Sequence, residues 1–122
     1  MTHRLDDVLS RWCDRWRHRD VDGIVDLYRH DAALHWMPNM PRSDWGTVGL
    51  TAIFRGHLDN ASSAEARYGR VVGSDDGMCG APFSLRVDGV VYEGWAFFRL
   101  SPSGSIEVDR RYAGSFFEPL SE

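Results

Sequence analysis

Two charged residues near the end of the chain have the types and spacing needed for proton transfer. Asp109 and Arg111 are two positions apart on the predicted last strand, so their side chains lie on the same face of it. A carboxylate beside a guanidinium can act as an acid–base pair, and such pairs concentrate at functional sites. Surface ion pairs are commoner, and burying Ile106 and Val108 on the opposite face would leave Asp109 and Arg111 in water. Both interpretations remain open on the sequence alone.

Two histidines could supply a further acid or base near neutral pH. His35 lies in a short apolar strand, but if Leu34 and Trp36 point inward, the alternation of the strand turns His35 outward. His57 lies on the apolar face of a predicted helix, where it could reach a cavity or satisfy a hydrogen bond in the core. Both are candidate catalytic residues with an alternative structural role.

The sequence predicts neither a bound metal nor a cofactor. His3, His18 and His30 have no second ligand at a metal-binding spacing, and no Gly-rich phosphate-binding motif or nucleophilic serine motif is present. Cys13 and Cys79 have no C-x-x-C spacing, which predicts two reduced, packed thiols. Any reaction would then use protein side chains alone.

Composition predicts one globular domain over residues 1–122. Hydrophobic residues make up 43% and charged residues 26% of the 122 residues, and aromatic residues reach 12%. The net charge is −4 and arginines alternate with acidic residues, so we expect no nucleic-acid partner. No apolar run has the length of a membrane span, and no secretory signal is recognisable, so we expect a cytoplasmic protein without membrane contact.

Hydrophobic periodicity predicts three helices in the first half of the chain. The first runs over residues 4–18, and the second begins after the N-cap Asp20 and ends near His30. A strand over 32–37 leads into an irregular loop over 38–45, and a third helix follows. Its apolar face carries Leu50, Ile53, Phe54, His57 and Leu58.

From Glu65 onward the period changes to two, and turn signals at 74–77, 88–89 and 101–104 separate four candidate strands. They predict an antiparallel meander and an α+β fold, with the helices across one side of a curved sheet. In the strand over 90–100, Trp95 and Phe97 lie on the face opposite Ala96 and Phe98. Two large rings on an outer face suit a homodimer interface.

The order of these elements resembles the nuclear transport factor 2-like superfamily and its SnoaL-like domains. The resemblance covers nearly the whole chain and is carried by DVDGIVDLYRHDA from Asp20, by residues 49–53, and by residues 104–106 with 110–112. It implies a cone-shaped single domain, three N-terminal helices on a curved, mostly antiparallel sheet, and an enclosed pocket. It also turns Asp109 and Arg111 toward that pocket.

The same resemblance argues against two known mechanisms. Steroid isomerases of this fold use a tyrosine, a carboxylate base and a protonated aspartic acid, whose positions correspond here to Trp12, to Trp36 or Met37, and to Ala96. The water-activating residues of limonene epoxide hydrolase correspond to Leu34, Trp36, Phe83, Leu85 and Arg111. SnoaL-like polyketide cyclases remain the relatives that the residues contradict least.

The resemblance implies a cavity lined by Trp12, Trp16, Trp36, Phe54, Phe83, Leu85, Ala96 and Phe98. Simple core packing would explain the same rings. We expect a cofactor-independent SnoaL-like enzyme that moves protons on a hydrophobic cyclic molecule, in a cyclisation, isomerisation or dehydration. Asp109 with Arg111, aided by His35 or His57, would carry the reaction. The alternative is a non-catalytic module of the same fold that binds a small ligand or dimerises.

Overall fold

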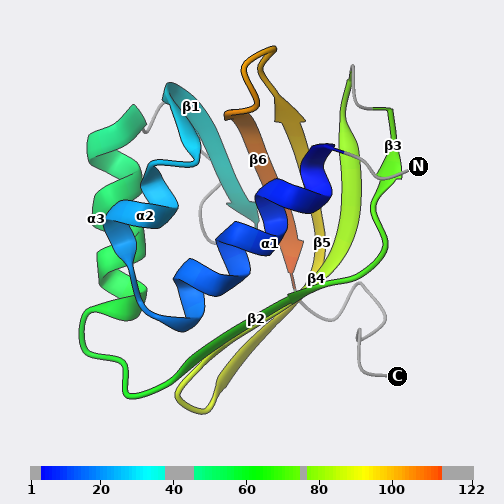
Figure 1. Ribbon diagram of the computed structural model, residues 1–122. Helices are drawn as coiled ribbons and strands as arrows, with labels where there is room; N and C mark the ends of the chain where they lie inside the picture. Colours follow the sequence, from blue (N-terminus) through cyan, green and yellow to red (C-terminus); the bar gives the residue numbers. More distant parts are fainter. Residues whose placement is uncertain (1–3, 38–45, 75–76, 114–122) are drawn as a thin grey trace.

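The computed structural model describes residues 4–37, 46–74 and 77–113 (Figure 1). The first helix, α1, spans Arg4–Arg17, as the periodicity predicts. It buries Leu5, Val8, Leu9, Trp12 and Trp16 along one stripe, with acidic residues in its first turn and arginines in its last. These charges complement the helix dipole, while the buried stripe fixes which side of α1 faces the sheet.

The second helix is shorter than the sequence predicts. α2 spans only Val21–Val25, with the Asp20 side chain accepting a hydrogen bond from the Gly23 backbone N–H at 3.0 Å. The chain then enters strand β1, Tyr28–Met37, so the prediction of a helix to His30 is wrong. The backbone N–H of Ile106 donates to the carbonyl of Leu27, and Tyr28 pairs with Ile106. Pairing with the last strand therefore outweighs the helical pattern of residues 27–30.

Helix α3 spans Gly46–Leu58 and buries Leu50, Phe54 and Leu58. Gly46 has a φ of 57°, a left-handed conformation that glycine adopts without strain. The loop predicted over residues 38–45 lies outside the described residues. Because α3 contacts β1 and α2, it closes the β1 side of the domain (Figure 1).

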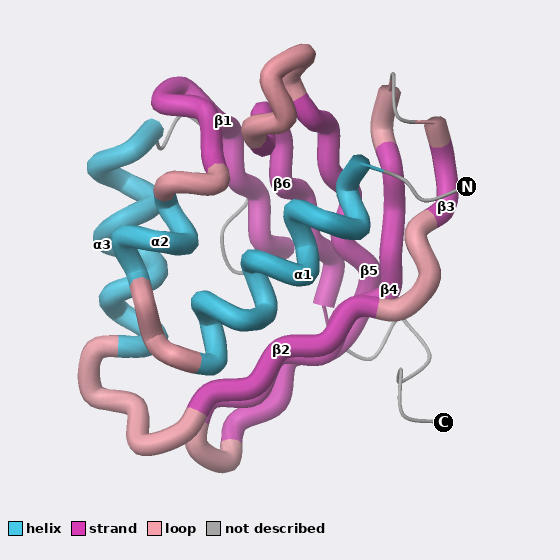
Figure 2. The backbone as a smooth tube through the Cα atoms, viewed as in Figure 1, coloured by secondary structure: helices cyan, strands magenta, loops and turns pink. Residues whose placement is uncertain are grey.

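The remaining strands are β2 Ala64–Tyr68, β3 Val72–Gly73, β4 Cys79–Val87, β5 Val90–Leu100 and β6 Ile106–Ala113. The sheet order is β1-β6-β5-β4-β2, with β3 paired to β4. β2, β4, β5 and β6 form the predicted four-stranded antiparallel meander, and the short β3 was not predicted. β1 joins β6 in parallel. This α+β arrangement curves around its concave face, and α1 crosses that face (Figure 2).

Candidate functional site

Asp109 and Arg111 form an ion pair inside the cone. Their side chains are 0% and 1% exposed. Arg111 Nε donates to Asp109 Oδ1 at 2.9 Å, and Arg111 Nη2 donates to Asp109 Oδ2 at 3.1 Å. This two-point geometry is the strongest form of an arginine–carboxylate contact. Burial is the largest influence on the pKa of Arg111 and lowers it, but the attraction of Asp109 and smaller contributions from Tyr68 and Tyr28 together exceed it. The pKa of Arg111 is therefore raised, and the guanidinium stays charged.

An irregularity in β6 turns this pair inward. Ile106 and Asp109 are both buried although they are three residues apart, and the pairing register with both β1 and β5 shifts between them. Strict alternation would bury Val108 and leave Asp109 and Arg111 in water, and that interpretation of the sequence is wrong. Glu107 sits at the shift and forms ion pairs with Arg29 and Arg99 on the outside. The inward face implied by the family resemblance is the observed one.

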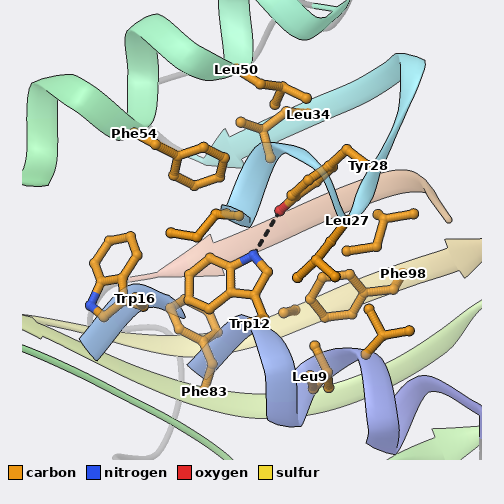
Figure 3. Close-up of a cluster of buried hydrophobic side chains, with 14 of the residues drawn as sticks. Leu9, Trp12, Trp16, Leu27, Tyr28, Leu34, Leu50, Phe54, Phe83 and Phe98 are labelled. Atoms are coloured by element: carbon orange, nitrogen blue, oxygen red, sulfur yellow. Dashed lines mark hydrogen bonds between the residues drawn. The ribbon is translucent and has the colours of Figure 1, made fainter. Parts of the chain in front are cut away.

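Tyr28 is a member of the site that the sequence pattern missed. Its hydroxyl donates to Asp109 Oδ2 at 2.5 Å. The same hydroxyl accepts from Trp12 Nε1 at 3.0 Å (Figure 3). Burial, followed by the negative charge of Asp109, raises the pKa of Tyr28 well above its ordinary value, so the phenol stays protonated. A buried tyrosine normally needs a partner for its hydroxyl. That requirement is the signal that could have linked Tyr28 to the site.

A shell of aromatic rings surrounds the guanidinium. Arg111 Cζ lies 4.7 to 5.4 Å from the ring centroids of Trp12, Trp36, Phe83, Tyr68 and Phe98. Cations are attracted to aromatic faces at such distances. Tyr68 was not among the predicted pocket residues. Its hydroxyl is buried, and burial raises the pKa of Tyr68 far above its ordinary value.

The predicted pocket residues come together, but they fill the interior. Trp12 and Trp16 stack with ring centroids 5.0 Å apart, and Phe54 packs edge-on against both. Figure 3 shows Trp12, Phe54, Phe83 and Phe98 pointing toward one another from α1, α3, β4 and β5. The fully buried members of the predicted set are Trp12, Trp16, Phe54, Phe83, Leu85, Ala96 and Phe98, whereas Trp36 is partly buried. The interior around the ion pair is therefore closely packed.

Three buried polar atoms have no hydrogen-bond partner among the described residues. They are Nη1 of Arg111, Nε1 of Trp36 and the hydroxyl of Tyr68. Arg111 contacts the rings of both other residues, and its charge lowers the pKa of Tyr68 against the effect of burial. Buried polar atoms are normally bonded, so this cluster is an exception with functional interest.

The two candidate histidines occupy different environments. His57 packs against the rings of Trp16, Trp36 and Tyr92, with centroids 5.6 to 6.3 Å apart. Burial lowers its pKa below the ordinary value of 6.5, so the imidazole is neutral at neutral pH. Leu34 is fully buried and Trp36 contacts Arg111, which leaves His35 on the opposite face of β1. His57 thus shares the neighbourhood of the ion pair, and His35 lies on the other side of the sheet.

Two hollows lie side by side between α1 and β2, which we call together the α1–β2 groove. The larger, about 660 Å³, is lined by Ser10, Cys13, Asp14, Arg17, Glu65, Ala66, Arg67, Ser84 and Arg86. The smaller, about 200 Å³, is lined by Asp6, Leu9, Ser10, Cys13, Tyr68 and Gly69. They share Ser10 and Cys13. Tyr68 therefore borders both this groove and the guanidinium of Arg111.

The thiol of Cys13 is unreactive at neutral pH. Burial raises the pKa of Cys13 from 9.0 to about 11, although the charge of Arg111 acts in the opposite direction. A thiol with such a pKa is protonated at neutral pH and is a poor nucleophile. Among the described residues, no group of three metal-binding side chains comes together. No helix in the described ranges has the length and apolar character needed to cross a membrane.

Comparison with solved structures identifies the fold. SalBIII, an epoxide hydrolase/cyclase-like enzyme in pyran ring formation in polyether salinomycin, is 17% identical, with a TM-score of 0.73 and 89% of each chain covered. A nuclear transport factor 2-like protein of unknown function from Burkholderia xenovorans LB400 is 19% identical, with a TM-score of 0.72 and coverage of 94% of this chain and 86% of the other.

A further nuclear transport factor 2-like protein of unknown function, from Exiguobacterium sp. 255-15, is 17% identical at a TM-score of 0.72, covering 88% of this chain and 98% of the other. No family model matches the sequence, and no curated protein matches it. Identities this low establish the architecture and leave the reaction to be argued from the site. The chain has the nuclear transport factor 2-like, SnoaL-like fold.

Proposed function

We propose that the protein is a cofactor-independent SnoaL-like enzyme that transfers protons on a hydrophobic cyclic small molecule. The observation that carries this proposal is the Asp109–Arg111 pair, buried at the centre of the concave face within an aromatic shell. Burying two charges costs several kcal/mol per ion before their attraction is counted, and an apolar pair of similar size would often be at least as stable. A charged pair kept in such a place is typical of a functional site.

In this proposal the two members of the pair have different tasks. Both oxygens of Asp109 accept hydrogen bonds, from Arg111 and from Tyr28, so this carboxylate is poorly placed to remove a proton from a substrate. Its task is to position Arg111, whose Nη1 keeps an unused N–H group. A fixed donor in an apolar cage stabilises negative charge that develops on an oxygen atom.

His57 is the base in this proposal. Its imidazole is neutral at neutral pH, and it packs against the Trp36 ring that also contacts Arg111. His57 takes a proton from a carbon next to a carbonyl group, and the electron pair of that C–H bond moves to the carbonyl oxygen near Arg111. Returning the proton to another carbon isomerises the substrate. Expulsion of hydroxide as water dehydrates it, and attack of the enolate on a second carbonyl closes a ring.

A second candidate function has an observation of its own. The rings that line the predicted pocket fill it, which favours a non-catalytic module that binds a small ligand or only supports dimerisation. The fold supports both functions, and SalBIII, one of its structural neighbours, is a cyclase-like enzyme. Turnover separates the two candidates.

The experiment is hydrogen–deuterium exchange on a substrate-like ketone. β-Tetralone, a fused-ring ketone with exchangeable protons next to its carbonyl, is incubated with the protein in D₂O, and the loss of those proton signals is followed by NMR. We expect wild-type protein to accelerate exchange and His57→Gln to reduce that acceleration by on the order of 100-fold. His35→Gln, on the opposite face of β1, is the matched control. Unaccelerated exchange with wild-type protein would favour the non-catalytic module.

We also propose that two copies join through the convex face of the sheet. Trp95 and Phe97 stack at 6.2 Å, Tyr112 packs edge-on against Phe97 at 5.9 Å, and all three rings are only partly buried in one copy. Aromatic residues are enriched at the centres of interfaces. A second copy would cover these rings through the same patch, as a twofold axis requires.

A further inference from the structure

The buried guanidinium lacks an acceptor for part of its donor set. Asp109 uses Nε and Nη2 of Arg111, while Nη1 has no partner among the described residues. The hydroxyl of Tyr68 and the indole N–H of Trp36 are also buried without a hydrogen-bond partner among the described residues, and both rings contact Arg111. An indole and a guanidinium can only donate, whereas a protonated phenol can donate and accept. The Tyr68 oxygen is thus the one possible acceptor among these three residues, and its interaction with Arg111 lowers the pKa of Tyr68. Arg111 Nη1 and Trp36 Nε1 nevertheless both lack a hydrogen-bond partner among the described residues, and an acceptor oxygen of a ligand would satisfy them.

One wall of the aromatic shell, the ring of Tyr68, borders a hollow of the described surface. Trp12, Phe83 and Phe98 are fully buried around Arg111, whereas Tyr68 is partly exposed and lines the smaller hollow of the α1–β2 groove. The positive charge of Arg111 also acts on the thiol of Cys13, which lines both hollows. A single tyrosine ring therefore separates the groove from the guanidinium.

Charge decides which kind of oxygen fits. Arg111 and Asp109 together carry no net charge, and the arginines at the groove rim, Arg17, Arg67 and Arg86, are exposed to water. A carboxylate ligand would place a second negative charge beside Asp109 without a buried cation to pair with it, which is costly in an apolar interior. A carbonyl oxygen accepts the same hydrogen bonds without that charge.

We propose that the α1–β2 groove is a ligand-binding site for a neutral ring compound, whose carbonyl oxygen accepts hydrogen bonds from Arg111 Nη1 and the Tyr68 hydroxyl. The ring body lies in the groove between α1 and β2, and the carbonyl reaches the guanidinium as the Tyr68 ring turns aside. The site rests on the proposed function only for the cyclic, hydrophobic character of the ligand. Beyond that function, the groove proposal specifies where the ligand enters, which groups donate hydrogen bonds to it, and that the ligand is uncharged.

Three probes of one shape test the proposal: acetylnaphthalene, ethylnaphthalene and naphthoate. Their dissociation constants are measured by the chemical shifts of the tryptophan indole N–H signals. A hydrogen bond from the charged guanidinium, together with one from the Tyr68 hydroxyl, should favour the ketone over the hydrocarbon by about 10- to 100-fold, and we expect the carboxylate to bind no more tightly than the hydrocarbon. Equal binding of ketone and hydrocarbon, or tightest binding of naphthoate, would overturn the proposal.

Two further measurements place the ligand. Tyr68→Phe removes one donor and keeps the ring, so the preference for acetylnaphthalene over ethylnaphthalene should shrink, whereas Tyr112→Phe on the convex face should keep it. Saturating acetylnaphthalene should also slow the reaction of Cys13 with dithiodipyridine at alkaline pH, read from the Cys13 peptide by mass spectrometry. A Cys13 rate that the ketone leaves unchanged would place the ligand elsewhere and contradict the proposal.

These results are independent of turnover. Suppose that acetylnaphthalene protects Cys13 and binds wild-type protein more tightly than Tyr68→Phe, but that the protein does not accelerate β-tetralone exchange. The groove site would then be supported, and the proposed enzymatic function would be refuted. If exchange is accelerated and depends on His57, while the ketone leaves Cys13 unprotected, the enzyme stands and its substrate enters by another route.

Discussion

The two faces of strands β5 and β6 differ in how far they bury large and charged side chains. On the concave face, Ala96, Phe98, Asp109 and Arg111 are all buried, and the charges are paired with each other. On the convex face, Trp95, Phe97 and Tyr112 are only partly buried, and Arg110 is exposed. A charge hidden among rings is typical of a site for chemistry, and rings left open are typical of a surface for another molecule.

The largest expected effect comes from breaking the concave pair. Asp109→Ala leaves the Arg111 charge unpaired inside the aromatic shell, and removing one partner of a buried pair costs about 3 to 5 kcal/mol. Urea denaturation measures the loss in the free energy of unfolding. Asp31→Ala is the matched control, because Asp31 also pairs with an arginine, Arg29, but is exposed on the outside. If Asp109→Ala lowers the free energy of unfolding no more than Asp31→Ala does, the result would contradict a buried, paired Asp109.

The convex face is tested by replacing its two stacked rings. Trp95→Ser combined with Phe97→Ser removes two partly buried rings and should cost roughly 3 kcal/mol in the free energy of unfolding. Sedimentation of folded protein should change from dimer to monomer, because the proposed interface loses its centre. An unchanged sedimentation profile would refute this interface. The buried rings of Trp12 and Trp16 lie on the concave side, and the variant should keep their near-ultraviolet circular dichroism signals.

Tyr28→Phe probes the support of the concave pair without removing a charge. It removes the hydrogen bond to Asp109 and leaves the Trp12 indole N–H without its acceptor. Hydrogen bonds to charged groups contribute about 1.5 to 3 kcal/mol, so we expect a loss of about 2 kcal/mol in the free energy of unfolding. Tyr92→Phe serves as the control in the same denaturation experiment. Equal losses in the two variants would show that Tyr28 has no special role.

Tyr68→Phe has the smallest expected effect on the free energy of unfolding, and it should stabilise the protein where the other variants destabilise it. The Tyr68 hydroxyl is buried without a partner among the described residues, so removing it relieves a penalty of about 1 kcal/mol. The variant should unfold at a higher urea concentration than the wild type. A gain in stability together with weaker ketone binding is the signature of a residue kept for function. Destabilisation would mean that the hydroxyl is satisfied in the unliganded protein.

The sequence predicts the fold well where one element follows one clear period. α1, α3, β4 and β5 follow their apolar patterns closely, and the order of elements predicted from these patterns is the feature that resembles a known superfamily. The pattern misassigned residues 27–30, because pairing of Tyr28 with Ile106 is a contact between residues far apart in the chain. Local periodicity carries no information about such a partner.

The candidate site was predicted in part, for the same reason. Asp109 and Arg111 share a face, as their spacing requires, but the register shift at Glu107 that turns them inward is invisible to a pattern of strict alternation. Tyr28 and Tyr68 were not predicted because each acquires its role only from neighbours on other elements. The rings that line the predicted pocket were identified, and whether they enclose a space or fill it depends on packing that spacing does not encode.

The central claim is that the concave face moves protons through His57, and the pH profile of β-tetralone exchange tests it most directly. Because burial lowers the pKa of His57 below 6.5, the imidazole is already unprotonated at neutral pH. The protein-dependent rate should therefore rise with pH, level off below neutrality, and lose this profile in His57→Gln. A rate that keeps rising about tenfold per pH unit through neutrality, or an unchanged profile in His57→Gln, would contradict the account.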